Sequence, residues 1–143
     1  MSLETGFSGL DRIFNLNKKQ IEKKLKESIP NKILLVAEAI RKKINLKRIF
    51  TLSKIDPWFL EQIKEIVDNE NKIKKKGLPK DFNEFNRIKS IGFSDKKLSE
   101  LTRISEGAVR RKRTVLKILP VFKKVDTCAA EFKSFTPYMY STY

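Results

Sequence analysis

The stretch Ser53-Lys-Ile-Asp-Pro-Trp-Phe-Leu60 holds the only tryptophan of the chain and its clearest helix start. Asp56 can cap the helix with its carboxylate, and Pro57 suits the first helical position, where a missing N–H costs nothing. The apolar residues that follow recur at spacings of three and four, which is typical of a helix with one buried face. Because an aromatic ring can bury on the order of 150–250 Å², we predict that this helix centres the core. The predicted core residues are Trp58, Phe59, Leu60 and Ile63.

The residues that lead into this helix start have a second copy at an offset of 49 residues. The stretch Asn45-Leu-Lys-Arg-Ile-Phe-Thr-Leu-Ser-Lys-Ile-Asp56 matches Ser94-Asp-Lys-Lys-Leu-Ser-Glu-Leu-Thr-Arg-Ile-Ser105 in its caps, basic positions and apolar positions. Each copy predicts a short helix, a tight turn and a second capped helix, with Ser94 and Ser105 as caps. No segment alternates convincingly with period two. We therefore predict an all-α, compact multi-helix domain with two helix-turn-helix-like units.

Changes in composition along the sequence divide the chain into three parts. We predict an N-terminal segment and a basic surface helix over residues 1–30, a helical core over residues 31–119, and an extended tail over residues 120–143. The tail is rich in aromatic residues, whereas a free terminus is usually polar. We predict that it docks against another surface through Phe132, Tyr138, Tyr140 and Tyr143.

The formal net charge of +15 makes nucleic acid the first partner to consider. The stretch Ser94–Leu116 has the helix lengths of a helix-turn-helix reader, with Arg110 to Arg113 on its second helix. Base-reading residues normally come from the first turn of that helix, where this chain has Glu106 and Gly107. Lysine, which reads phosphates and bases less specifically than arginine, also dominates the basic residues. A nucleic-acid-binding protein remains the alternative hypothesis.

Catalysis has little support in the sequence. The chain has no histidine and one cysteine, Cys128, so the usual zinc ligand sets, a histidine base and an internal disulfide are excluded. There is no phosphate-binding loop and no nucleophile motif. We predict no catalytic, cofactor-binding or metal-binding residue. The absence of a long apolar run or a leader pattern predicts a cytoplasmic protein without a membrane span.

Several stretches together resemble one family, the large subunit of carbamoyl-phosphate synthetase, in its helical oligomerisation domain. They are Ser2-Leu-Glu-Thr-Gly6, Lys54-Ile-Asp-Pro-Trp-Phe-Leu-Glu-Gln-Ile63, Gly92-Phe-Ser-Asp95, Phe122-Lys-Lys-Val-Asp-Thr-Cys-Ala-Ala-Glu-Phe132 and Thr136-Pro-Tyr-Met-Tyr-Ser-Thr-Tyr143. The sequence departs from the family at Lys43, where a glycine is common, and over Asn15–Ser28. The resemblance implies that the chain is an excised part of a longer bacterial subunit.

The resemblance also implies a role. The chain would be a non-catalytic module that links two ATP-using synthetase halves and contributes to self-association of the large subunit. The parent ligase would make carbamoyl phosphate from bicarbonate, glutamine-derived ammonia and two ATP, for arginine and pyrimidine synthesis. It would use ATP with Mg or Mn, and K, and would receive ammonia from a glutaminase small subunit. No specific nucleic acid and no membrane would be partners.

Overall fold

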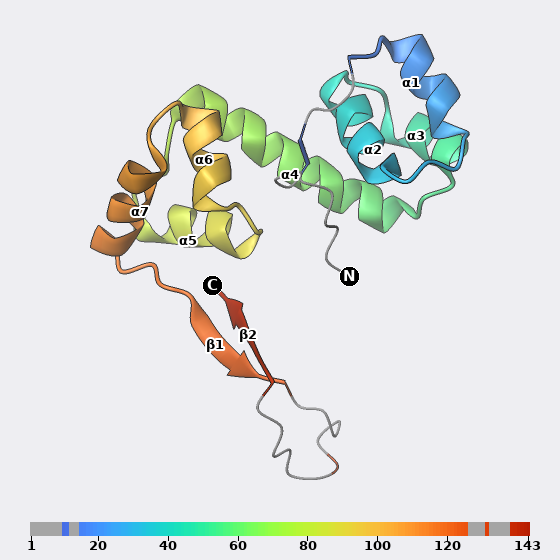
Figure 1. Ribbon diagram of the computed structural model, residues 1–143. Helices are drawn as coiled ribbons and strands as arrows, with labels where there is room; N and C mark the ends of the chain where they lie inside the picture. Colours follow the sequence, from blue (N-terminus) through green and yellow to red (C-terminus); the bar gives the residue numbers. More distant parts are fainter. Residues whose placement is uncertain (1–9, 12–14, 126–130, 132–137) are drawn as a thin grey trace. The chain divides into compact units, whose positions relative to one another are not determined.

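The computed structural model describes residues 10–11, 15–125, 131 and 138–143. The described part is helical except for two short strands (Figure 1), as the sequence predicts. In chain order the elements are α1 (Lys18–Leu25), α2 (Lys32–Arg41), α3 (Leu46–Ser53), α4 (Pro57–Lys76), α5 (Phe82–Ser90), α6 (Asp95–Thr102), α7 (Glu106–Val115), β1 (Val121–Lys124) and β2 (Met139–Thr142). The chain divides into two compact units, Met1–Lys75 (unit 1) and Lys76–Tyr143 (unit 2).

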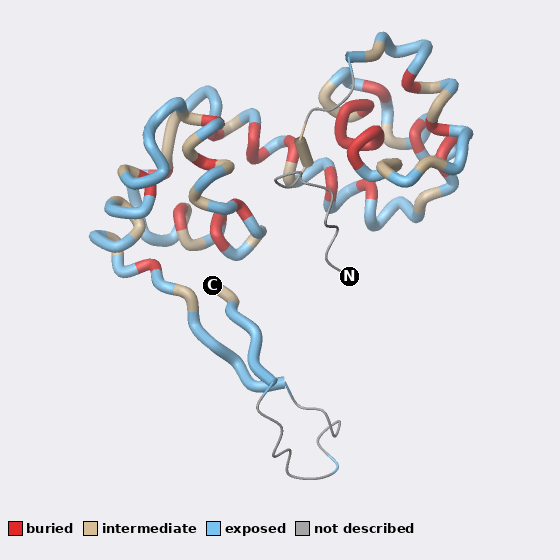
Figure 2. Tube along the Cα trace, in the orientation of Figure 1, coloured by how far each residue is buried: buried red, intermediate tan, exposed pale blue. Residues whose placement is uncertain are grey.

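Unit 1 is organised around α2. Every residue from Leu34 to Ala39 is buried, and Figure 2 shows this helix as the most continuously buried segment of the unit. Helices α1 and α3 both contact α2 and also contact each other. The prediction that the tryptophan helix centres the core is therefore wrong for this unit, because α2 is buried nearly all round and α4 only along one stripe. The core comprises Ile21, Leu25, Leu35, Val36, Ala37, Ala39, Ile44, Ile49, Leu52, Leu60, Ile63 and Val67.

Helix α1 begins with a capping box. The Asn17 side chain accepts a hydrogen bond from the Gln20 N–H at 2.9 Å, and the Gln20 side chain accepts one from the Asn17 N–H at 2.9 Å. This arrangement satisfies two N–H groups that the first turn leaves without partners. The helix is not only a basic surface element, since Ile21 and Leu25 on its inner face are fully buried.

Unit 2 contains α5, α6, α7 and the two strands. Its buried apolar residues are Phe85, Ile88, Phe93, Leu98, Leu101, Val109 and Ile118. The strands pair antiparallel, with Val121 opposite Thr142 and Lys124 opposite Met139. The tail predicted as extended thus forms a small two-stranded sheet where it is described.

The backbone conformation repeats at the same offset of 49 residues as the sequence. Helices α3 and α6 both end at a left-handed residue, Lys54 at φ 58° and Arg103 at φ 59°. Forty-nine residues also separate Lys43 (φ 59°) from Gly92 (φ 103°), which follow α2 and α5. The correspondence therefore extends one helix further toward the N-terminus than the sequence analysis predicted.

Candidate assembly interface

Three aromatic side chains of α3 and α4 are exposed in unit 1. Trp58 is 60% exposed, Phe59 56% and Phe50 41%, whereas Leu60 is 1% exposed. The prediction that Trp58 and Phe59 belong to the core is wrong. Leu60, Ile63 and Val67 form the inward stripe of α4 at helical spacing, which turns positions 58 and 59 outward.

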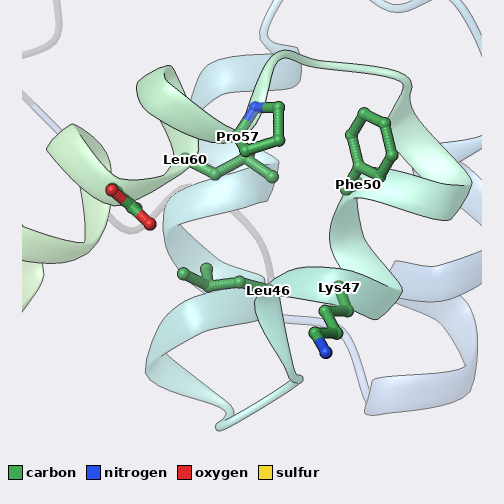
Figure 3. A pocket seen from close by; sticks show the side chains of 6 residues that line it. Leu46, Lys47, Phe50, Pro57 and Leu60 are labelled. Carbon is green, nitrogen blue, oxygen red and sulfur yellow. The ribbon is translucent and has the colours of Figure 1, made fainter.

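The two outward rings contact each other. Their centroids lie 4.9 Å apart at an interplanar angle of 85°, an edge-to-face arrangement that aromatic pairs favour. Beside them α3 and α4 form a groove of about 300 Å³ (Figure 3). The groove is lined by Leu46, Lys47, Phe50, Pro57, Leu60 and Glu61. We refer to this groove together with Trp58 and Phe59 as the α3–α4 face.

Asp56 fixes where the exposed helix begins. Its Oδ1 accepts a hydrogen bond from the Trp58 N–H at 2.8 Å, which satisfies one donor of the first turn. In unit 2, Ser94 Oγ accepts from the Lys97 N–H at 3.0 Å and Ser105 Oγ from the Ala108 N–H at 3.3 Å. All three residues predicted as caps thus accept a hydrogen bond from the helix that they precede.

A buried ion pair ties α2 to α4 within unit 1. The Arg41 Nη2 atom donates to Glu70 Oε2 at 2.8 Å and to the Leu10 carbonyl, and Arg41 Nε donates to Glu70 Oε2 at 3.2 Å. Both side chains are only 4% exposed. Glu38 lies 3.6 Å from the same guanidinium. Because breaking such a pair leaves a buried charge without its partner, the pair holds α4 against α2.

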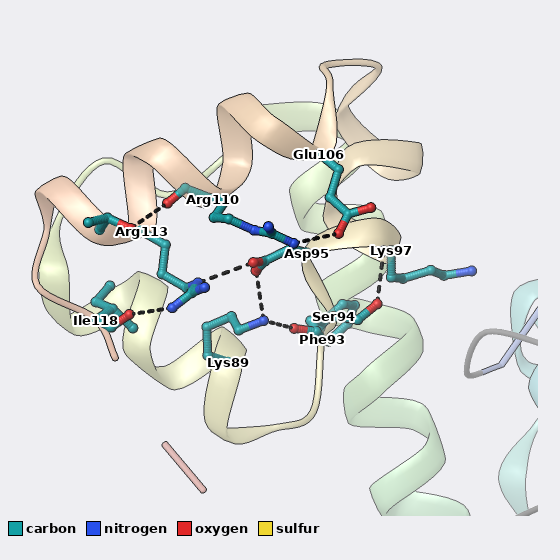
Figure 4. A network of polar contacts seen from close by, with 10 residues as sticks. Lys89, Phe93, Ser94, Asp95, Lys97, Glu106, Arg110, Arg113 and Ile118 are labelled. Carbon is teal, nitrogen blue, oxygen red and sulfur yellow. Dashed lines mark hydrogen bonds and ion pairs between the residues drawn. The ribbon is translucent and has the colours of Figure 1, made fainter. Parts of the chain in front are cut away.

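Unit 2 has its own buried polar network (Figure 4). Lys89 Nζ donates to Asp95 Oδ1 at 2.9 Å and to the Phe93 carbonyl at 2.7 Å. Arg113 Nε donates to Asp95 Oδ2 at 3.2 Å, and its Nη1 donates to the Ile118 carbonyl at 2.9 Å. A single carboxylate in the first turn of α6 thus joins α5 to α7.

The pKa of Asp95 lies below its usual range. Burial raises the pKa of this carboxyl, but the hydrogen bond and charge of Lys89, with those of Arg113, lower it by more. Asp95 therefore carries a negative charge at neutral pH that the two cations balance.

One of the four residues predicted to dock reaches this network. The Tyr143 ring lies 5.0 Å from Lys89 Nζ and 5.9 Å from the Arg113 guanidinium carbon, within the range of cation–π attraction. Tyr138 and Tyr140 on the other hand are exposed. Phe132, like Cys128, lies outside the described residues.

Helix α7 does not present its cations as one binding face. Arg113 is turned into the network around Asp95, and Arg110 pairs with Glu106 at 3.4 Å. The nucleic-acid hypothesis gains no support from this arrangement. Over the ranges that the structure describes, no helix could cross a membrane, and no three potential metal ligands cluster.

Sequence reasoning missed the groove and both ion-pair clusters. One sequence pattern could have indicated the groove. Helix α3 carries more apolar residues than its buried face contains, namely Leu46, Ile49, Phe50 and Leu52. No pattern indicated the ion pairs, because their partners lie up to 29 residues apart among many other charged residues.

Comparison with known proteins identifies the chain's relatives. Residues 1–117 match the family described as carbamoyl-phosphate synthetase large chain, oligomerisation domain. The carbamoyl phosphate synthase large chains of Brucella melitensis biotype 1, Haemophilus ducreyi and Pasteurella multocida are 43%, 44% and 46% identical to it. Each alignment covers 99% of this chain and 13% of the relative, so the chain spans about an eighth of their length. The chain therefore belongs to the carbamoyl-phosphate synthetase large-chain family, as its oligomerisation domain.

Proposed function

We propose that the chain works as a non-catalytic assembly module, which spaces the two synthetase halves of a large subunit and contributes to self-association of that subunit. The observation that carries the proposal is the family match over residues 1–117. Two features support it. The α3–α4 face offers exposed aromatic rings, and the most buried charged groups, around Arg41 and Asp95, are engaged in holding helices together.

The relatives' name, carbamoyl phosphate synthase, supports a parent reaction that forms carbamoyl phosphate. A subunit of this kind would combine bicarbonate, glutamine-derived ammonia and two ATP in the cytoplasm. ATP, Mg or Mn, and K would bind in parts of the subunit outside these residues, and a glutaminase small subunit would supply ammonia. Within the chain, residues 31–119 would be the helical core. Residues 120–143 would dock against the second synthetase half through Phe132, Tyr138, Tyr140 and Tyr143.

Sedimentation velocity on the chain, over a range of protein concentrations, tests the assembly role. The proposal expects a sedimentation coefficient that rises with concentration toward a discrete dimer. A single monomeric species at every concentration would contradict self-association by these residues.

A further inference from the structure

We infer that Lys89 and Arg113 form a seat for the aromatic ring of Tyr143, and that this seat fastens the two-stranded sheet to the helices of unit 2. The inference goes beyond the proposed function, because it gives Tyr143 a partner within the chain itself. Tyr143 is only partly buried, so the rest of its ring stays accessible for the docking role proposed above.

The sheet buries little of its own surface. All four residues of β1 are exposed, and Thr142 is the only residue of β2 that is partly buried. A sheet of two strands is at best marginally stable in water when nothing packs against it. Contacts at the ends of the strands therefore decide where the sheet lies.

Arg113 reaches both ends of the sheet. Its Nη1 atom donates to the carbonyl of Ile118 at 2.9 Å, in the segment that leads into β1. Its guanidinium carbon lies 5.9 Å from the ring centroid of Tyr143, the residue that follows β2. A single side chain of α7 thus contacts the chain just before the first strand and just after the second.

The seat carries a surplus of positive charge. Lys89 and Arg113 share the carboxylate of Asp95 (Figure 4), so the three side chains have a net positive charge. They are between 5% and 12% exposed, and buried charges are screened only weakly. The face of an aromatic ring attracts a cation within about 6 Å of its centroid. Lys89 Nζ, at 5.0 Å from the Tyr143 centroid, and Arg113 both lie within this range.

Asp95 is the positioning residue of the seat. Its Oδ1 atom accepts from Lys89 at 2.9 Å, and its Oδ2 atom accepts from Arg113 at 3.2 Å. These bonds fix a cation of α5 beside a cation of α7, so that one ring can contact both. The seat thereby couples the end of the tail to three helices. Because such coupling is reciprocal, displacing the Tyr143 ring should also weaken the network around Asp95.

Amide hydrogen exchange measured by NMR tests whether the ring fastens the sheet. Tyr143→Leu should speed exchange in β1 and β2, and at the Val125 N–H that bonds the Tyr138 carbonyl, about five- to tenfold, as expected for loss of a partly desolvated cation–π contact. Tyr143→Phe keeps the ring face and should exchange like the wild type. Tyr138→Leu is the matched control, because it removes an exposed ring. It should change exchange in the strands less than about twofold.

The proton chemical shifts of the Lys89 side chain give an independent readout. The ring current of Tyr143 should move the protons next to the Lys89 ammonium upfield of those of exposed lysines. The upfield shift should vanish in Tyr143→Leu and persist in Tyr143→Phe and Tyr138→Leu. It should also vanish in Asp95→Asn, under conditions where far-UV circular dichroism shows this variant folded. A shift that persists in Asp95→Asn would refute the positioning role of Asp95.

Two results would overturn the seat itself. If Tyr143→Leu leaves strand exchange and the Lys89 shifts at their wild-type values, the ring does not fasten the sheet. If Tyr143→Phe behaves like Tyr143→Leu, the hydroxyl group and not the ring face makes the contact. Neither result bears on self-association, so the proposed assembly function is tested separately.

Discussion

Replacing Asp95 by asparagine should destabilise the chain strongly. Asp95 is the only carboxylate between Lys89 and Arg113 in the network, at 2.9 and 3.2 Å, and the side chains are between 5% and 12% exposed. Removing one partner of a buried ion pair costs about 3–5 kcal/mol. Because Lys89 and Arg113 each keep a backbone carbonyl partner, we expect the lower end, about 3 kcal/mol.

The loss should depend on pH in a definite direction. The folded-state pKa of Asp95 lies below its ordinary value, so its contribution is fully present above the unfolded pKa, near about 4. The contribution disappears as the pH falls through the folded-state pKa. The difference in unfolding free energy between wild type and Asp95→Asn should therefore be largest at neutral pH and shrink below about pH 4.

Urea unfolding followed by far-UV circular dichroism measures both effects. Asp68→Asn serves as the matched control, because the Lys64–Asp68 pair is also a lysine–aspartate contact, at 2.8 Å against 2.9 Å for Lys89–Asp95, but both of its side chains are at least half exposed. The midpoint of this variant should not move. If Asp95→Asn unfolds at the wild-type midpoint at neutral pH, or if its deficit is undiminished in acid, the account of the network is refuted.

Three further changes test other parts of the structure by urea unfolding. Lys43→Gly should stabilise the chain by about 1 kcal/mol, because Lys43 sits at φ 59° in the left-handed region; a loss of stability would contradict this. Glu70→Gln should cost about 3 kcal/mol by removing the carboxylate to which Arg41 donates its hydrogen bonds, and a neutral outcome would show that the pair contributes nothing. At concentrations too low for self-association, Leu60→Ala should cost about 2–5 kcal/mol whereas Trp58→Ala should stay within about 0.5 kcal/mol; equal costs would mean that Trp58 is buried after all.

The local signals in the sequence predicted local structure well. Side-chain oxygens before a helical pattern need only a nearby N–H, so Asp56, Ser94 and Ser105 could be recognised as caps from a few residues. The repeat was visible for the same reason, since caps and turn positions recur at fixed spacing. The left-handed backbone at Lys43 was signalled indirectly, as a departure from a position where the family often has glycine.

The sequence could not predict which apolar residues of a helix face the core, or which charged side chains form ion pairs. Trp58, Phe59 and Leu60 are consecutive and all apolar, yet they point to different sides of α4, and periodicity alone cannot choose the inner side when a helix is apolar over most of its first turn. The partners of Asp95 come from two other helices, among 32 basic residues. The four-residue strands β1 and β2 are too short for alternation to be visible.

The response of self-association to salt tests most directly the claim that this chain is an assembly module with an apolar interface. Sedimentation velocity would give the dissociation constant at about 0.1 M and about 1 M salt, where the screening length falls from about 10 to about 3 Å. Because the exposed rings of the α3–α4 face are apolar, we predict a dimer that persists at high salt, as screening also weakens repulsion between two +15 chains. A dimer that dissociates at high salt, or a monomer under both conditions, would contradict the account.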